Sequence, residues 1–162
     1  MQGAAAVLPD AAAILPAEEN AMSTIDQMIA GLGLDIDKPF KVELIDPITS
    51  APMTDKEGKA FYVELLSPDS ERGQAAYKAI RLNRMKQRNP NKIDIDKENA
   101  TQLAAITTGW YLGDFDGNVF DVPCTPENAK QIYMAPPLAW LFELVNLAAN
   151  DRANLSKASS KS

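Results

Sequence analysis

The stretch that decides the fold is CTPENAKQIYMAPPLAWLFELVNLAANDRANL, residues 124–155. Thr125 can cap a helix whose first residue is Pro126, because a proline has no amide hydrogen left unsatisfied at that position. Pro136 and Pro137 open a second helix that is apolar on almost every side. The stretch therefore predicts two packed helices and contains few groups suited to catalysis.

The last helix, expected over residues 137–155, has a single narrow polar stripe formed by Glu143, Asn146 and Asn150. A surface helix needs an apolar arc of only ~100°. This helix is therefore either the centre of the core or packed between its own core and a partner. The candidate partner contacts are Trp140, Phe142, Leu144 and Leu147, with Arg152 at the end.

Composition excludes several classes of function. The chain has 162 residues, which fits one domain, and its net charge of −6 argues against binding nucleic acid through bulk charge. It has no histidine, which removes the commonest general base and the commonest zinc ligand. We therefore predict a protein that is not an enzyme, with no catalytic residue, metal ligand or cofactor.

Cys124 is the only cysteine, so no internal disulfide can form and a reducing compartment is favoured. Its place before a helix could lower the thiol pKa, but a small buried apolar side chain is the preferred interpretation. No run approaches the ~20 apolar residues that span a bilayer. The expected location is the cytoplasm.

Three segments are expected along the chain. Residues 1–38 read as a flexible N-terminal extension with a short helix from Ser23, and Met22 reads as a natural start. Residues 39–156 should form a single α+β domain. Residues 157–162 read as a flexible tail.

The fold class expected for residues 39–156 is α+β, with an N-terminal antiparallel β-hairpin packed on a small bundle of about four helices. Alternation of Phe40, Val42 and Leu44 with charged residues predicts a half-buried strand. The same period recurs at residues 61–65, so a long-looped hairpin is expected over 40–66. A second, short hairpin is expected near 110–122, turning at Asp116-Gly117.

Helices are expected at about 68–89, 97–108, 125–133 and 137–155. In the first, Ser67 caps and Pro68 begins the helix, and alanines with Leu82 form the core stripe. In the second, Asp96 caps and Gly109 ends the helix. The expected core stripe of the first helix is Ala75, Ala76, Ala79 and Leu82.

One face of the 68–89 helix is basic, through Lys78, Arg81, Arg84 and Arg88. Acidic residues predominate from residue 94 to residue 127, so the molecule should have a positive and a negative patch. A solvated face and contact with a charged partner are both compatible with this pattern. Phosphate binding is disfavoured because no stacking aromatics are interleaved with the bases.

Asp114-Phe-Asp-Gly-Asn118 invites a calcium interpretation. With Gly117 as the sixth residue of an EF-hand loop, the first and twelfth positions would be Leu112 and Pro123, which cannot bind calcium. A turn built by aspartate and glycine is the better prediction.

The order of these motifs resembles the tail assembly chaperones of long-tailed bacteriophages. The resemblance covers roughly residues 40–155, and Ser50 and Leu155 depart from it, standing where a glycine and an aromatic residue are usual. The motifs that carry it are Asp46-Pro-Ile-Thr, Ser67-Pro-Asp-Ser70, Thr108-Gly-Trp110, Gly117, Thr125-Pro-Glu-Asn-Ala129 and Asp151-Arg-Ala-Asn-Leu155.

The resemblance implies a non-catalytic protein of the host cell cytoplasm that coats the tape-measure protein, keeps its hydrophobic helices soluble and helps recruit tail-tube subunits. A homo-oligomer is compatible with it, as is a frameshift-extended form. The alternative is a structural or decoration protein of the virion. A third hypothesis is a nucleic-acid-binding accessory protein that uses Arg81, Arg84 and Arg88. No contact with a membrane is expected.

Overall fold

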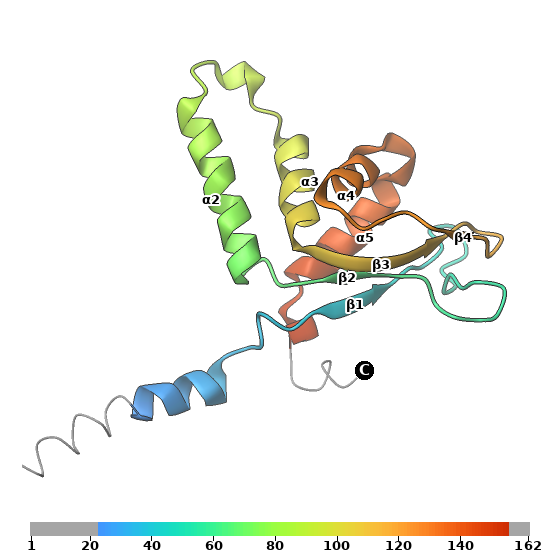
Figure 1. Cartoon of the computed structure of the whole chain (residues 1–162), viewed down its shortest axis with the longest axis horizontal. Coiled ribbons are helices and arrows are strands. Elements are labelled where there is room, and N and C mark those ends of the chain that lie inside the picture. Colours follow the sequence, from blue (N-terminus) through green and yellow to red (C-terminus); the bar gives the residue numbers. More distant parts are fainter. Residues whose placement is uncertain (1–22, 156–162) are drawn as a thin grey trace, which may run out of the picture. The chain divides into compact units, whose positions relative to one another are not determined.

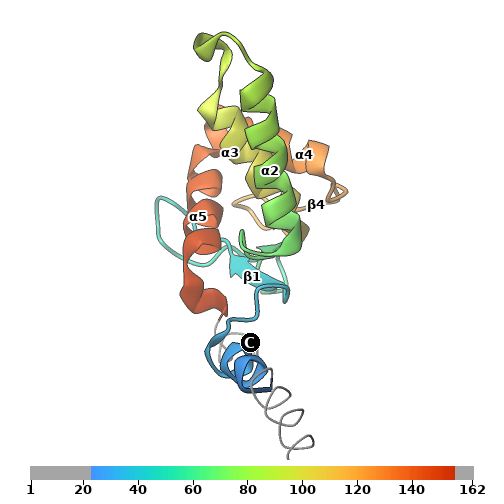
Figure 2. The same ribbon diagram turned by 90° about the vertical axis from the view of Figure 1, so that its left-hand side faces the viewer.

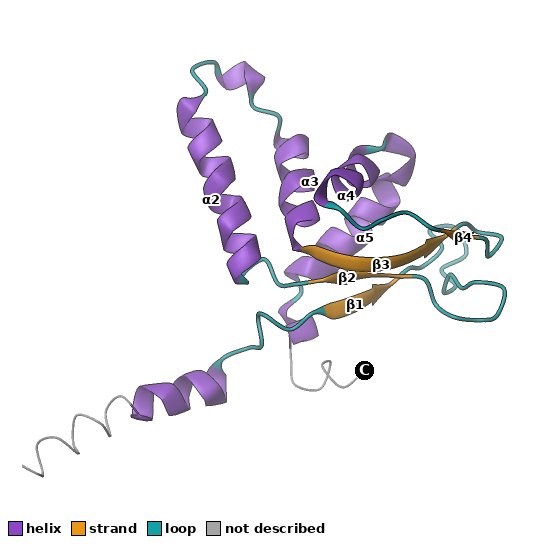
Figure 3. Cartoon of the chain, viewed as in Figure 1, coloured by secondary structure: helices purple, strands orange, loops and turns teal. Residues whose placement is uncertain are grey.

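A computed structural model describes residues 23–155. The chain divides into two compact units, residues 1–34 and residues 35–162. In the described part of the first unit, residues 23–32 form a helix. The second unit is α+β, as predicted: strands form one layer and helices another (Figure 3). Its elements are β1 (Phe40–Glu43), β2 (Tyr62–Leu65), α2 (Glu71–Lys86), α3 (Ile95–Ile106), β3 (Thr107–Gly113), β4 (Val119–Phe120), α4 (Pro126–Met134) and α5 (Ala139–Asn150), with short 3₁₀ helices at Pro90–Lys92, Pro136–Leu138 and Arg152–Leu155.

The four strands form one antiparallel sheet in the order β1-β2-β3-β4. Val42 lies opposite Val63, and Val63 lies opposite Trp110. These positions and their neighbours two residues away face the helices, because side chains alternate along a strand. The predicted alternation is confirmed: the apolar side chains at 40, 42, 44, 61, 63 and 65 are all buried.

The strands at 40–66 and at 110–122 are not two separate hairpins, as the sequence suggested. They belong to one sheet, because β2 pairs with β3 along its whole length, with an irregularity between Glu64 and Leu65. β3 also begins at Thr107 rather than near Trp110. The chain passes from α3 into β3 without a loop, so Gly109 lies inside the strand and does not end the helix.

The helices of the second unit pack mainly on one side of the sheet. Figure 1 shows α3 between α2 and α4, with α3 and α4 above β3. Figure 2 shows α4 and α5 to either side of the α2–α3 pair. The core between these helices and the sheet includes Leu103 and Ile106 of α3 and Val145 of α5.

Two predicted helix starts are wrong by a few residues. α2 begins at Glu71 and is capped by Ser70, whose hydroxyl accepts a hydrogen bond from the Gly73 amide, 3.2 Å away. Ser67 instead accepts from the amide of Asp69 in a local turn. α3 is capped by Asp94 rather than Asp96. In both cases two residues able to cap stand close together, and tertiary packing selects the later or the earlier one.

α5 also differs from its prediction, because the apolar run from 137 to 155 is broken into three pieces. A 3₁₀ turn precedes it, and Asp151 ends it before a second 3₁₀ turn. By contrast, the predicted capping of α4 is confirmed: the Thr125 hydroxyl accepts from the Asn128 amide at 3.1 Å.

The predicted core stripe of α2 is not a core stripe. Leu82 is 49% exposed, Ala75 and Ala79 are exposed, and Gly73 is the one buried residue of the helix. α2 packs against α3, but Tyr77 and Met85 are also 52% and 79% exposed. The helix therefore retains apolar surface that the second unit does not bury.

The loop between β1 and β2 contains a left-handed backbone conformation. Ser50 has φ of 61°. In this left-handed region the Cβ atom crowds the backbone, and glycine avoids that crowding. The Asp46 carboxylate accepts from the amides of Ile48 and Thr49 and holds the turn that ends at Ser50.

We predict that Ser50→Gly raises the free energy of unfolding by up to about 1 kcal/mol, because relief of the left-handed strain exceeds the added entropy of the unfolded chain. Urea unfolding followed by circular dichroism measures the change. Ser50→Ala keeps the Cβ atom and is the matched control, expected to stay within about 0.5 kcal/mol of the parent. An equal gain in both variants would contradict the role of φ.

Candidate protein-binding surfaces

α5 presents an apolar face that the second unit covers only in part. Trp140, Leu144 and Leu147 share one side of the helix by their spacing, and Leu147 is 73% exposed while the other two are half-buried. The ring of Phe115, itself 60% exposed, lies 5.9 Å from the Trp140 ring. We call Phe115, Trp140, Leu144 and Leu147 the α5 face.

The other two predicted contacts of this helix region lie elsewhere. The Phe142 ring packs edge-on against Tyr133 at 6.0 Å, on the side of α5 that faces α4. Arg152 pairs with Asp69, with 3.4 Å between Nη2 and Oδ2. Both residues therefore have partners within the chain, and neither belongs to the α5 face.

The Tyr133 side chain, against which Phe142 packs, is held by a hydrogen bond. Its hydroxyl lies 2.8 Å from the Thr107 hydroxyl, which in turn donates to the Leu103 carbonyl. Burial raises the pKa of Tyr133 to about 12. The phenol thus stays protonated and links α4 to the junction of α3 and β3.

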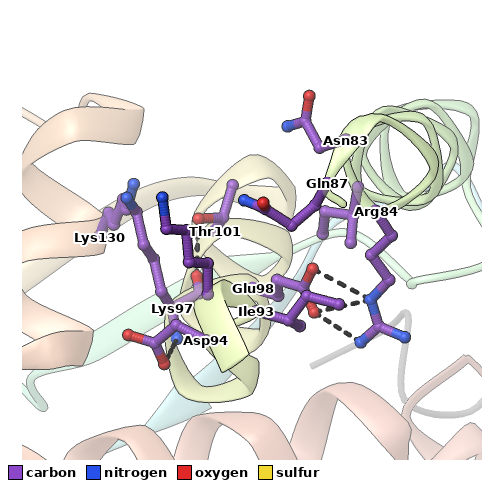
Figure 4. A pocket seen from close by; sticks show the side chains of 11 residues that line it. Asn83, Arg84, Gln87, Ile93, Asp94, Lys97, Glu98, Thr101 and Lys130 are labelled. Carbon is purple, nitrogen blue, oxygen red and sulfur yellow. Dashed lines mark hydrogen bonds and ion pairs between the residues drawn. The ribbon is translucent and has the colours of Figure 1, made fainter. Parts of the chain in front are cut away.

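The residues of the predicted basic row on α2 have different environments in the structure. Arg84 makes a two-pronged ion pair with Glu98 of α3, with Nε 2.9 Å from Oε1 and 3.0 Å from Oε2 (Figure 4). The hydrogen bond from Arg84 lowers the pKa of Glu98 below its usual value. Arg81 lies over the Tyr77 ring, 5.8 Å from its centroid. Arg84 is therefore engaged by Glu98, whereas Lys78, Arg81 and Arg88 make no ion pair within the described residues.

A groove runs along α3 between α2 and α4. Its lower part lies near the start of α2, has a volume of about 450 Å³ and has small residues of α2 and α3 in its walls and floor. Its upper part lies near the end of α2, has a volume of about 370 Å³ and shares Thr101 and Lys130 with the lower part. Figure 4 shows Lys97 and Lys130 side by side at one wall and Gln87 at the other. We call it the α2–α4 groove; the lower part is lined by Arg72, Ala75, Thr101, Ala104, Ala105, Pro126, Glu127 and Lys130.

The sequence did not reveal this groove, nor Phe115 as part of the α5 face. The alanines expected in the core stripe of the 68–89 helix are exposed or half-buried instead, and Ala75 lines the groove. Phe115 lies in the Asp-Gly turn, and an aromatic residue at the tip of such a turn could have been predicted to be exposed.

The remaining candidates for chemistry have ordinary structural roles. Burial raises the pKa of the Cys124 thiol, so the interpretation with a lowered pKa is wrong. The Asp114 carboxylate accepts from the amides of Asp116 and Asn118 and from the Asn118 side chain, and Gly117 has φ of 87°, as the turn prediction requires. Within residues 23–155 no cluster of three or more acidic or cysteine side chains could hold a metal ion.

In the part of the chain that the structure describes, no single helix is long and apolar enough to cross a membrane. Residues Pro126–Met134 and Pro136–Asn150 reach the required length and composition only when taken together, and they are bent by 88°.

β3 is tied to the β1–β2 loop through Tyr111. Its hydroxyl donates to Asp55 Oδ2 at 2.6 Å, and the Lys59 ammonium lies 4.5 Å from the ring centroid. The hydrogen bond raises the pKa of Tyr111 to about 12 and lowers the pKa of Asp55. The pair therefore fixes the loop at neutral pH.

These shifts set a pH window for the loop. The lowered pKa of Asp55 stabilises the folded chain at pH values above the usual carboxyl pKa, and this stabilisation is lost as the pH falls through the lowered pKa. The raised pKa of Tyr111 stabilises the folded chain below about pH 10, and this stabilisation is lost as the pH rises toward 12.

We predict that Asp55→Asn lowers the pH at the midpoint of Tyr111 ionisation, which is measured by the ultraviolet absorbance of the phenolate. Tyr111→Phe should remove that component. An unchanged midpoint in Asp55→Asn would contradict the pairing.

Comparisons with known proteins give no relative for this chain: no protein-family model, no curated protein and no solved structure matches it.

Proposed function

We propose that this chain is a non-enzymatic assembly chaperone of a long-tailed bacteriophage. In this proposal it works in the host cell cytoplasm, binds hydrophobic helices of the tape-measure protein and helps tail-tube subunits assemble. The β1–β2 hairpin serves as scaffold for the helices. The sequence motifs between residues 40 and 155 are the ground for naming the phage system.

The observation that carries the proposal is the α5 face. A chaperone for apolar helices needs exposed apolar surface on a rigid element, since flexible side chains alone would give a weak and disordered contact. Leu141, Val145 and Ala149 anchor the opposite side of α5 in the core, with exposed fractions of 5%, 0% and 5%. α5 is therefore held firmly while Leu147 remains 73% exposed.

The chemistry of the described residues also supports a binding role. The one cysteine has a raised pKa, which disfavours thiolate chemistry. The bidentate Arg84–Glu98 pair and the Tyr133–Thr107 hydrogen bond join helices and strands to one another. These charged and polar groups are thus used for structure, and the apolar surface is left for a partner.

We predict that Leu147→Asp lowers the amount of tape-measure protein kept soluble when the two chains are co-expressed, because a carboxylate on the α5 face must be desolvated in the complex. Loss of one buried leucine contact corresponds to about 10- to 100-fold weaker binding. The measurement is the soluble fraction after centrifugation. Folding should persist, since substitutions at exposed positions change stability by about 0.5 kcal/mol or less.

Ile48→Asp is the matched control. Ile48 is 89% exposed but lies in the β1–β2 loop, so the same loss of an apolar side chain should leave client solubility unchanged. Equal effects of the two variants, or none from Leu147→Asp, would refute the role of the α5 face. Recovery of the chain at fixed stoichiometry from purified particles would instead favour a structural or decoration protein.

A further inference from the structure

The helix of residues 23–32 has an exposed apolar stripe. Its four large apolar residues are spaced i, i+3, i+4 and i+7, which places them on one face. Every one of them is more than half exposed: Ile25 57%, Met28 56%, Ile29 64% and Leu32 78%. This is the spacing with which an amphipathic helix anchors in a groove.

The segment that carries this helix is strongly acidic. Residues 1–37 hold six acidic residues and no lysine or arginine, whereas residues 38–162 hold sixteen of each sign. The whole net charge of −6 therefore belongs to the N-terminal segment. Its docking site should be apolar at the floor and basic at the rim.

The α2–α4 groove has both properties. Its floor is made by Thr101, Ala104 and Ala105, whose small side chains allow a helix backbone to approach closely. Three basic side chains surround it, from α2, α3 and α4, and none of them is ion-paired within the described residues: Arg72, Lys97 and Lys130. The acidic side chains of the lining are Asp94, Glu98 and Glu127, and Glu98 is already paired with Arg84. α3 has 12 residues and is ~18 Å long, so the groove along it can hold the ~15 Å of the 23–32 helix.

We propose that the helix of residues 23–32 from one copy of the chain docks in the α2–α4 groove of a second copy. The apolar stripe lies on the alanine floor, and Asp26 faces the basic rim. Such a contact joins two different surfaces, so copies associate head to tail.

The helix that binds in the groove comes from a second copy, because the linker between each helix and the second unit of its own copy is short. Ile36 packs against the core of its own unit, so three residues, 33–35, separate it from the helix. They span at most about 14 Å between residues 32 and 36. Ile36 precedes β1, which lies two strands, about 10 Å, from β3. Thr101 and Ala105 of the groove lie on the side of α3 opposite the core residues Leu103 and Ile106.

The proposal is tested with two full-length variants. Ile29→Asp damages the apolar stripe and leaves the groove intact, whereas Ala105→Trp fills the groove and leaves the helix intact. Sedimentation velocity across a range of concentrations should show association of the parent chain. We expect each variant alone to associate about 10- to 100-fold more weakly, and an equimolar mixture to form a one-to-one complex.

Gln27→Asp is the matched control, because residue 27 lies opposite the stripe and the change adds the same charge. It should associate like the parent. Circular dichroism confirms that each variant is folded, and Ala105→Ser with Lys130→Glu replaces Ala105→Trp if the tryptophan unfolds the chain. A parent chain that stays monomeric, variants that associate normally, or a mixture that does not form the complex would overturn the proposal. A monomeric parent whose residues 23–32 are protected from proteolysis would show that the helix docks on its own copy instead.

Discussion

The burial of β2 against the helices is the constraint on which the rest of the second unit depends. Val63 and Leu65 are 1% and 0% exposed, and β2 is hydrogen-bonded to a strand on each side. Only a few helices can pack on the covered face of a four-stranded sheet, and α3, α4 and α5 provide the buried residues there. α2 is left outside, bound through α3, and this is why the molecule has both a groove and an uncovered helix.

The electrostatic organisation follows from the same arrangement. α2 carries five basic residues and one acidic residue, and a helix in the core could not hold so many charges without large desolvation costs. Outside the core these charges are solvated, except that Arg84 is fixed by Glu98 and joins α2 to α3. The basic helix and the acidic N-terminal segment belong to one chain, so complementary charge can direct association without a large exposed apolar area.

Local features of the fold were predictable from the sequence, and non-local ones were not. Period-two alternation at residues 40–44 identified a strand, and Thr125 with Pro126 identified a helix start, because both signals depend on neighbours along the chain. The pairing of β2 with β3 joins residues more than forty positions apart, and no local pattern encodes it. The alanines of α2 show the limit most clearly: their spacing predicted a core stripe, but α2 lies outside the core and Ala75 and Ala79 are exposed.

The same limit applies to the candidate surfaces. The sequence indicated that α5 has more apolar surface than a surface helix needs. It could not show that Phe142 packs against Tyr133 whereas Leu147 remains exposed. α5 and α4 lie on different sides of the α2–α3 pair (Figure 2), and no residue of α5 lines the α2–α4 groove. A client helix on α5 and a second copy in the groove would not compete for the same residues. Copies joined head to tail could then bind successive segments of one long client, and each bound copy would raise the effective concentration of the next.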